Sequence, residues 1–365
     1  MVARARIAVI GTGWWATYAH IPTILKHSDA ELVALADIRP DVLSNAADLY
    51  GVERTYTDYR TLLEQEKVDG AVIATWHAAH YEPALACLQG GLNIVLEKPM
   101  VLRATQARTL VETARANKRE LIMSYPFNYL PQSVRAREAV QSGELGEVVF
   151  ISNTFSDTVS DLYRGNDMAD SPEMAEQYVV EGPGDVYSDP TRSGGGQGHL
   201  QATHNIAIML FITGLQPEHV VALMDNRETR VDVSNAISAR MQGGRLASIA
   251  STGEVYGGKG TLFLQIYCSR GRIDLDYMAN SGTIFFSDGR VEDLTLPPGS
   301  EWNHPEFAGY PAHAPVNNLI DVIHGRAGSH TPSEVGWYTV EILDAAYRSA
   351  AQDGVGIDTA SLYDI

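Results

Sequence analysis

Cysteine is scarce in this chain. Cys87 and Cys268 are the only two, and they stand in unrelated contexts. A disulfide framework or a cysteine-based zinc site is therefore not expected, and the scarcity favours a reducing compartment such as the cytoplasm.

Positive charge and long apolar runs are also lacking. Asp and Glu number 45 against 27 Lys and Arg, which leaves a formal net charge of -18 at pH 7. Nucleic acid and anionic membrane would each require a basic face, so neither is predicted as a partner. No apolar run reaches the ~18 residues of a membrane helix, and the amino terminus lacks the apolar core of a signal peptide. We therefore predict a cytoplasmic location.

The remaining composition is that of an ordinary globular protein, with 45% hydrophobic and 20% charged residues in a chain of 365. That length allows two domains of usual size. Because the rhythm of the predicted elements changes after residue 124, we expect one domain over residues 1–124 and a second over 125–365.

A glycine motif follows the first predicted strand. Residues 6–10 form a short branched run that leads into GTGWWA at 11–16 and then into an amphipathic helix. In such a G-x-G-x-x-A motif, the first glycine makes the tight turn, the second lets the backbone approach a pyrophosphate, and the alanine allows helix and strand to pack closely. The motif predicts a dinucleotide site that includes Gly11, Gly13, Trp14 and Trp15.

Asp37 ends the second predicted strand, residues 31–36, at the distance of about twenty residues that this motif requires. A carboxylate at that position can accept both ribose hydroxyls of NAD and would repel the 2′-phosphate of NADP. Arg39 close by could soften the preference. The pattern therefore favours NAD as the cofactor over NADP.

The stretch NIVLEKPM at residues 93–100 lies at the centre of the predicted site. Its apolar part is short enough for a buried parallel strand, which Glu97-Lys98-Pro99 closes. Pro99 has no backbone donor and restricts the residue before it, so Lys98 is expected to be held at the mouth of the sheet. Ligands of open α/β sheets bind at that edge.

Strands and helices alternate through the first part of the chain. A third strand at 70–75 ends in the loop Trp76-His77-Ala78-Ala79-His80, which should lie at the same edge. Helices at 81–89 and 104–117 and a strand at 120–124 complete the pattern. It predicts a doubly wound parallel sheet.

The second part has a different pattern, which begins with a crossover at 125–131 and a helix at 132–141. Strand-like runs follow, many joined by short Gly or Asp-Gly turns, at residues 147–154, 220–224, 236–240, 247–252, 261–268, 271–275 and 283–286. They predict an α/β domain with a large open, mainly antiparallel sheet whose free face takes helices or a partner subunit. The segment 157–196, rich in Gly, Pro, Asp and Ser, is predicted to be a long functional loop.

A glycine-led apolar helix carries His199 and His204. Five residues turn a helix by roughly 140° net, so these two histidines cannot face one ion from the same side. His77 and His80 could do so, but no carboxylate accompanies them in sequence. No metal site is predicted, and His204 by its local sequence is either a satisfied core or cap histidine or a functional group.

Together these motifs resemble the Gfo/Idh/MocA family of glucose-fructose oxidoreductase, inositol dehydrogenase and rhizopine-catabolism proteins. The resemblance extends along the whole chain and rests on GTGWWA, Asp37, TYTDYRTLLEQEKVDGAVIAT, the helix at 80–91, EKP at 97–99, AVQSGELGEV, the GGG-led helix and EILDAAYRSA. It implies an amino-terminal Rossmann domain, a carboxyl-terminal α/β domain with a large open sheet, oligomers built on that sheet, and NAD(P)-linked oxidation or reduction of sugars and polyols.

Carried over residue by residue, the resemblance implies that Lys98 and His204 are the catalytic pair. It extends the predicted cofactor site to Thr75, Trp76, His77, His80, Glu97, Lys98 and Asn128. At the substrate it places Lys98, Tyr125, Tyr187, Gln201, His204 and Trp302. Four aromatic side chains could stack on sugar faces, namely Tyr163, Tyr187, Trp302 and Tyr310.

The match departs from the family pattern in three places. Leu200 stands where many relatives carry an Asp, so that Gln201 is the polar residue nearest to the histidine. Trp76-His77 replaces a Pro-Asn pair, and Asn128 replaces an arginine. The missing polar group could come from Asp185, Tyr187 or Asp189.

The predicted function is NAD-dependent hydride transfer between a hydroxyl carbon of a sugar, glycoside or inositol-like polyol and nicotinamide, in a homodimer or homotetramer. Two alternatives stay open. One is NAD-assisted glycoside cleavage or elimination, in which the hydride returns to the substrate. The other is a ligand-sensing homologue without turnover, which Leu200 favours and the retention of Lys98 and His204 disfavours.

Overall fold

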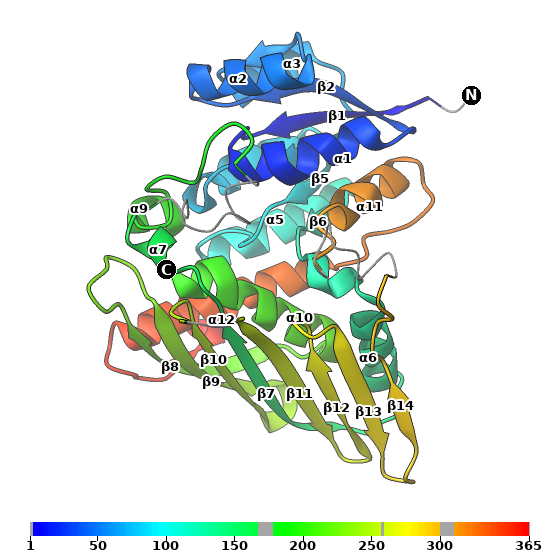
Figure 1. The fold of residues 1–365 in the computed structure, drawn as a ribbon, viewed down its shortest axis with the longest axis vertical. Helices are drawn as coiled ribbons and strands as arrows, with labels where there is room; N and C mark the ends of the chain where they lie inside the picture. Colours follow the sequence, from blue (N-terminus) through cyan, green and yellow to red (C-terminus); the bar gives the residue numbers. More distant parts are fainter. Residues whose placement is uncertain (1–2, 167–177, 257–258, 300–309, 365) are drawn as a thin grey trace.

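Two β-sheets organise the molecule, and Figure 1 shows them at opposite ends of its long axis with helices between them. The computed structural model describes residues 3–166, 178–256, 259–299 and 310–364. The first sheet has six strands in the order β3-β2-β1-β4-β5-β6, every pair parallel. Their bounds are β1 Ala5–Ile10, β2 Ala30–Ala36, β3 Thr55–Tyr56, β4 Gly70–Ile73, β5 Asn93–Leu96 and β6 Leu121–Met123.

Residues of the first sheet alternate between two cores, as the pleat of a strand requires. In β1, Ala8 and Ile10 join the hydrophobic cluster on one face, whereas Ile7 and Val9 join the cluster on the other. Helices cover both faces, and the predicted doubly wound sheet is confirmed. The helices of this region are a π-helical turn Ala16–His20, α1 Ile21–Lys26, α2 Pro40–Tyr50, α3 Tyr59–Gln65, α4 Tyr81–Gln89 and α5 Ala104–Asn117.

The second sheet has nine strands in the order β14-β13-β12-β11-β7-β10-β9-β8-β15. Among the strands that the structure describes, only β7 and β10 pair in parallel, so the predicted mainly antiparallel sheet is confirmed. Two short edge strands, β14 and β15, were not predicted. The bounds are β7 Val148–Ser156, β8 Pro217–Asp225, β9 Ser234–Met241, β10 Arg245–Thr252, β11 Thr261–Cys268, β12 Gly271–Asp276, β13 Ser281–Phe286, β14 Val291–Asp293 and β15 Ile357–Asp358.

Three helices fill the space between the sheets, as Figure 1 shows. They are α6 Pro131–Gln141, α10 Thr203–Thr213 and α12 Ser333–Ala350. Every residue of α10 is buried, because this helix is enclosed by α6, α12 and the second sheet. A helix that is apolar all round belongs in such a core. The position of α10, including its first turn, is therefore fixed by this packing.

Helix α11, Ala314–Ile323, returns from the second part of the chain to the first sheet. Its buried residues Val316, Leu319 and Ile320 share a core with Val72 and Val95 of the first sheet. The division of the chain at residue 124 stays a prediction. The packing of α11 shows that the core of the first sheet also uses residues far beyond that point.

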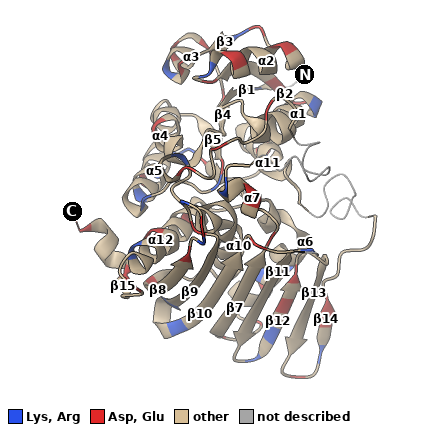
Figure 2. Ribbon diagram, turned by 60° about the vertical axis from the view of Figure 1, so that its left-hand side comes forward, with Lys and Arg blue, Asp and Glu red and all other residues tan. Residues whose placement is uncertain are grey.

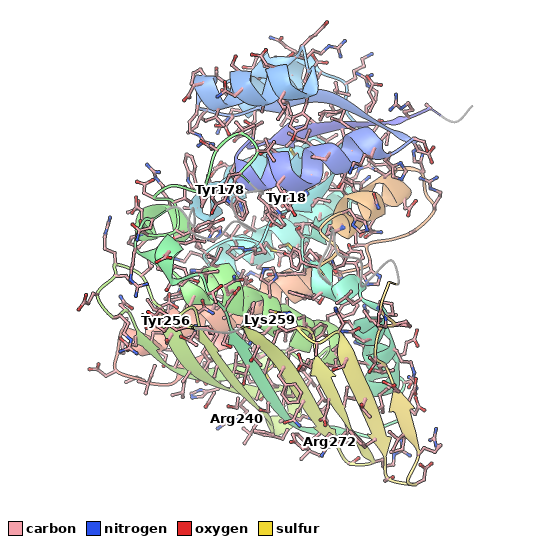
Figure 3. All side chains as sticks on the ribbon, in the orientation of Figure 1. Tyr18, Tyr178, Arg240, Tyr256, Lys259 and Arg272 are labelled. Atoms are coloured by element: carbon pink, nitrogen blue, oxygen red, sulfur yellow. The ribbon has the colours of Figure 1, made fainter. Side chains whose placement is uncertain are left out.

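The other face of the second sheet carries no helix among the described residues. Phe150 of β7 and Leu246 of β10 lie opposite each other in the ladder and are 37% and 52% exposed. Arg240 and Arg272, labelled in Figure 3, alternate with buried neighbours on β9 and β12. Figure 2 shows that acidic and basic residues are interspersed along the strands rather than gathered into one stretch of a single charge.

The segment predicted as a long loop is only partly irregular. It contains α7 Ser160–Tyr163 and α9 Pro190–Ser193, which is capped by the side chain of Asp189. Residues 167–177 of this segment lie outside the described part of the chain. Among the helices that the structure describes, none is long and apolar enough to cross a membrane.

Candidate active site

The glycine turn lies at the carboxyl end of β1, where the strand order of the first sheet reverses between β1 and β4. Gly11 has a φ of +91°, and a Cβ there would lie 2.6 Å from the carbonyl carbon of Ala74. Only glycine fits this conformation and this approach. A Cβ on Gly13 would be in ordinary contact with Arg39 Nη2 at 3.6 Å and with Glu181 Oε1 at 3.7 Å. Glycine at this place in the motif lets the backbone approach a pyrophosphate. The local geometry is that of a dinucleotide site.

Asp37 lies beside this turn at the end of β2. Its Oδ2 accepts a hydrogen bond from the Thr12 amide at 2.9 Å. Its two oxygens also accept from Nε and Nη2 of Arg39, at 3.1 and 3.2 Å. The predicted position next to the glycine turn is therefore realised, and the carboxylate is held there by both neighbours. Its contact with ribose hydroxyls stays a prediction.

Glu97 connects the glycine helix to the strand that carries Lys98. Its Oε1 accepts from the indole Nε1 of Trp15 at 2.9 Å and lies 2.8 Å from Nε2 of His20, and its Oε2 accepts from the Lys98 amide at 3.0 Å. Burial by itself raises the pKa of Glu97, but the contacts with His20 and the charge of Lys98 lower it to about 2. Glu97 is thus a buried carboxylate that stays charged. His20 was not predicted, although it follows the glycine motif by one helical turn.

Lys98 reaches from the first sheet to the helix below. Its Nζ donates to the carbonyl oxygen of Leu200 at 3.0 Å, while its side chain remains only partly covered. Burial lowers the pKa of Lys98 to about 8, although the charge of Glu97 opposes that shift. The predicted position of Lys98 at the mouth of the sheet is realised, and the ammonium points at the turn that precedes His204.

His204 lies one turn after Leu200, inside an aromatic cage. The rings of Tyr125, Phe127 and Tyr310 stand 6.1, 5.9 and 5.9 Å from its centre, all edge to face. Burial and then the charge of Lys98 place the pKa of His204 well below its usual range. Its Nδ1 is buried without a hydrogen-bond partner. The imidazole is therefore neutral at physiological pH and retains proton-binding capacity.

The histidines of the loop after β4 are held by backbone carbonyls. His77 Nδ1 lies 2.9 Å from the Ser193 oxygen, and His80 lies between the oxygens of Pro99 and Thr75 at 2.7 and 3.0 Å. Burial lowers the pKa of both rings. His80 thus ties the 75–80 loop to the Lys98-Pro99 turn. Among the described residues there is no group of three or more His, Cys, Asp or Glu that could hold a metal ion.

Asp232 fixes the start of the helix that carries His204, a role with no clear signal in the sequence. Its Oδ1 accepts from the Gly196 amide at 2.7 Å and from the Tyr347 hydroxyl at 2.6 Å, and its Oδ2 accepts from the Gly198 amide at 2.8 Å. A Cβ on Gly196 would lie only 2.0 Å from the Asp232 carbonyl oxygen. The run of glycines is therefore required by this close approach.

Other predicted residues have partners outside the Lys98–His204 pair. Gln201 donates to Asp157 at 2.7 Å, and burial raises the pKa of that carboxyl group. Asn128 donates to Thr331 at 3.5 Å. The ring of Tyr187 lies 5.5 Å from that of His77. Trp302 lies outside the described residues.

The two carboxylates considered as substitutes for the missing aspartate have partners on the surface. Asp185 pairs with Arg192 at 2.9 Å, and Asp189 caps α9 through the Thr191 amide at 3.1 Å. Neither contact supports a role beside His204. Asp157, which was not considered, lies at the end of β7 and reaches the turn of Gln201.

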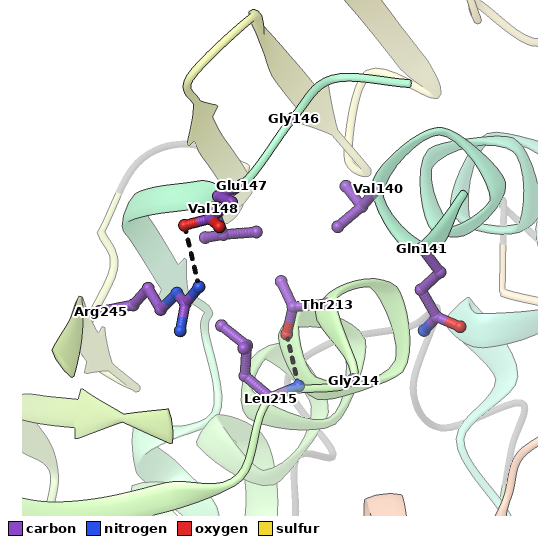
Figure 4. Close-up of a pocket in the computed structure, with 9 residues that line it drawn as sticks. All are labelled: Val140, Gln141, Gly146, Glu147, Val148, Thr213, Gly214, Leu215 and Arg245. Carbon is purple, nitrogen blue, oxygen red and sulfur yellow. Dashed lines mark hydrogen bonds and ion pairs between the residues drawn. The ribbon is translucent and has the colours of Figure 1, made fainter. Parts of the chain in front are cut away.

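A hollow of about 400 Å³ opens at the far end of α10 and is shown in Figure 4. It is lined by Val140, Gln141, Gly146, Glu147, Val148, Thr213, Gly214, Leu215 and Arg245. None of these is a predicted site residue. Helix α10 separates the hollow from His204, so its chemistry is distinct from the site described above.

Comparison with known families agrees with this arrangement. The model described as oxidoreductase family, NAD-binding Rossmann fold (Gfo/Idh/MocA) matches residues 5–125, and the model of the Gfo/Idh/MocA carboxyl-terminal domain matches residues 133–274. The chain belongs to the Gfo/Idh/MocA family. The resemblance noted from its motifs is thereby confirmed.

Curated members of the family are similar over part of their length. D-glucoside 3-dehydrogenase of Escherichia coli is 31% identical over 143 residues, which are 39% of this chain and 41% of that protein. The NADP-dependent D-xylose 1-dehydrogenase of Hypocrea jecorina is 30% identical over 206 residues, 54% of this chain and 49% of that protein. These alignments span half of each relative or less.

Solved structures of the family are similar in fold over nearly the whole chain. Levoglucosan dehydrogenase, solved with NADH and levoglucosan, superposes with a TM-score of 0.75 over 98% of this chain and 99% of that chain. The two sequences are 18% identical, so the likeness concerns the fold.

In this member of the family we predict that Asp232→Asn destabilises the fold. The new side-chain NH₂ group would face a backbone N–H in a buried place. Two donors cannot form a hydrogen bond, and leaving them unsatisfied costs about 1–3 kcal/mol. Urea unfolding measures the change. Asp225→Asn, at the exposed end of β8, is the control and should stay within about 0.5 kcal/mol of the wild type. An unfolding midpoint for Asp232→Asn equal to that of the control would contradict the capping role.

Proposed function

We propose that this protein is an NAD-dependent dehydrogenase that moves hydride between a hydroxyl carbon of a sugar, glycoside or inositol-like polyol and nicotinamide. One observation carries the proposal. Lys98 of the first sheet donates to the turn that precedes His204, and its charge helps to keep that imidazole neutral. A cation and a neutral base thus face the same place at the ligand-binding edge of the sheet.

The residues present fit a dinucleotide. The Gly11 turn admits no side chain, and Asp37 is hydrogen-bonded to that turn, where it can meet the hydroxyl groups of a ribose. When NAD is bound, its nicotinamide supplies the chemistry of hydride acceptance. Gly11, Gly13 and Asp37 would hold the nucleotide. Glu97 would keep Trp15 and Lys98 in place beside it.

The chain's own part in the reaction is proton handling. Neutral His204 takes the hydroxyl proton as the carbon loses hydride. The Lys98 ammonium lies beside the developing alkoxide and stabilises its negative charge. In the reverse direction, protonated His204 returns the proton to the new hydroxyl oxygen.

The substrate side combines aromatic rings with a polar pair. Tyr125 and Tyr310 line the cage around His204, and rings of this kind can lie against the apolar face of a sugar. Gln201 directly follows Leu200 in the chain, and its amide donates to the Asp157 carboxyl group at 2.7 Å. We propose that they bind hydroxyl groups of the substrate. The dehydrogenases of glucoside, xylose and levoglucosan among the similar proteins support a carbohydrate.

We predict NADH formation when the purified protein is incubated with NAD and a panel of sugars, glycosides and inositols. On the true substrate, His204→Ala should reduce turnover by about 10² to 10⁴, the usual contribution of a general base. His204→Gln, which keeps polarity and size but not basicity, should lose a similar amount. Absorbance at the NADH band measures the rates, and fluorescence titration should show unchanged NADH affinity.

Two outcomes would contradict this assignment. If His204→Ala stays within a few-fold of the wild type, the base lies elsewhere. If glycosides are cleaved while NADH does not accumulate, the hydride returns to the substrate and the reaction is not a net oxidation.

The dependence of kcat/KM on pH should reflect the protonation state of Lys98. Neutral His204 is available down to well below pH 6.5, whereas the charged form of Lys98 is lost as pH rises through about 8. Initial kcat/KM for oxidation should therefore be flat from pH ~6 to neutrality and fall above pH ~8, since this profile reflects groups of the free enzyme. In Lys98→Arg, whose guanidinium stays charged, the alkaline decline should disappear. Persistence of the decline in that variant would assign it to another group.

We further propose a homodimer or homotetramer that uses the free face of the second sheet. Phe150 and Leu246 lie side by side there, and the Tyr267 ring is 6.1 Å from Phe150. Exposed apolar side chains gathered on one face of a sheet are typical of an interface between subunits. The protein is proposed to act in the cytoplasm, without nucleic acid or membrane partners.

We predict that light scattering at micromolar concentration gives the mass of a dimer or tetramer. Phe150→Asp combined with Leu246→Asp should shift the protein to monomers, because buried unpaired charges oppose association. Leu25→Asp, on the exposed side of α1, is the control and should leave the mass unchanged. A monomeric wild type would refute the proposal.

A further inference from the structure

Arg39 is engaged through all three nitrogens of its guanidinium group. Nε and Nη2 donate to the two oxygens of Asp37, at 3.1 and 3.2 Å. The remaining nitrogen, Nη1, donates to Oε1 of Glu181 at 2.6 Å. Arg39 is therefore clamped between a carboxylate of the first sheet and one from a segment 142 residues away along the chain.

Glu181 is placed over the glycine turn by the packing of its own segment. Tyr178, labelled in Figure 3, meets the ring of Trp14 edge to face at 5.9 Å, and Val180 packs against the core of the first sheet. A Cβ on Gly13 would lie 3.7 Å from the Glu181 carboxylate. Its side chain is only 29% exposed. Glu181 therefore contacts Arg39 from a segment that packs against the glycine turn and the core of the first sheet.

The clamp changes the chemistry that a nucleotide would meet. In dinucleotide sites, an arginine near the acidic residue after the second strand accommodates the 2′-phosphate of NADP. Arg39 occupies that position in the sequence, but its donors are directed at carboxylates. Two negative charges against one positive charge leave the group net negative. A 2′-phosphate would have to displace Glu181 and would be repelled by Asp37, whereas the 2′-hydroxyl of NAD carries no charge.

We propose that Glu181 determines the preference for NAD over NADP, by withholding the Arg39 guanidinium from a 2′-phosphate. The segment that packs against the glycine turn would then also select the cofactor. Asp37 contributes direct repulsion, and Glu181 removes the cation that would otherwise offset it. This inference rests on the proposed use of a nicotinamide cofactor and adds a residue to its selectivity.

Binding of reduced cofactors tests the inference without knowledge of the substrate. NADH and NADPH are titrated separately by fluorescence against the full-length wild type, Glu181→Gln and Glu181→Ala. Both variants should lower the ratio of the NADPH to the NADH dissociation constant by about three- to tenfold, mainly through tighter NADPH binding. The effect should weaken with added salt, since a phosphate contact is being gained.

Two further variants locate the effect. Asp48→Asn removes the same charge from an exposed position on α2 and should leave the ratio at the wild-type value. Glu181→Gln combined with Arg39→Ala should lose the gain in NADPH affinity, because the released guanidinium is then missing.

The outcomes separate this inference from the proposed function. If the wild type binds NADH and the Glu181 variants keep its NADPH to NADH ratio, Glu181 has no part in selectivity and the inference fails alone. An equal change of the ratio in Asp48→Asn would show that overall charge causes the effect, and this would also overturn the inference. If the wild type binds neither cofactor, the proposed function fails and the inference with it.

Discussion

A buried carboxylate at the mouth of the first sheet is the group on which the site depends. Glu97 is almost fully removed from water and would not remain charged there alone, and the partly covered Lys98 follows it directly in the chain. Trp15 donates a hydrogen bond to Glu97, and His20 Nε2 lies 2.8 Å from the same oxygen. The contact with His20 and the charge of Lys98 keep the carboxylate ionised, with a pKa of about 2. The carboxylate in turn moderates the loss of charge that burial imposes on Lys98. The segment after the glycine turn, which carries Trp15 and His20, thus supports the carboxylate beside Lys98.

Coupling between the two sheets follows from the burial of α10. Every residue of this helix is buried, and most of them belong to the main hydrophobic cluster. The glycine segment that leads into it presents the backbone donors of Gly196 and Gly198, and Asp232 accepts from both. Lys98 completes the contact through the Leu200 carbonyl. His204 is therefore positioned by a rigid helix, and the residues around it need little rearrangement to meet a ligand.

The proposed selection between NAD and NADP also depends on direct contacts between a few charged side chains. Exposed charges that contribute to the net charge of -18 are largely screened by salt beyond about 10 Å. Asp37, Arg39 and Glu181 are different because they are partly covered and contact one another directly. Local contacts of this kind decide what a phosphate meets, whereas the overall charge does not.

Local patterns in the sequence determined much of this protein. The branched runs, the GTGWWA turn, Asp37 and the EKP stretch predicted a parallel sheet and a dinucleotide edge, because turn geometry and strand burial are set by neighbouring residues. Tertiary structure alone decided what lies across the site. His20, Asp157, Glu181 and Asp232 act on residues far away in the chain, and the side of a helix or loop that faces a carboxylate depends on packing. The packing of α11 against the first sheet could not be predicted from the sequence either. An amphipathic pattern shows that a helix must bury its apolar face, but it does not show against which element.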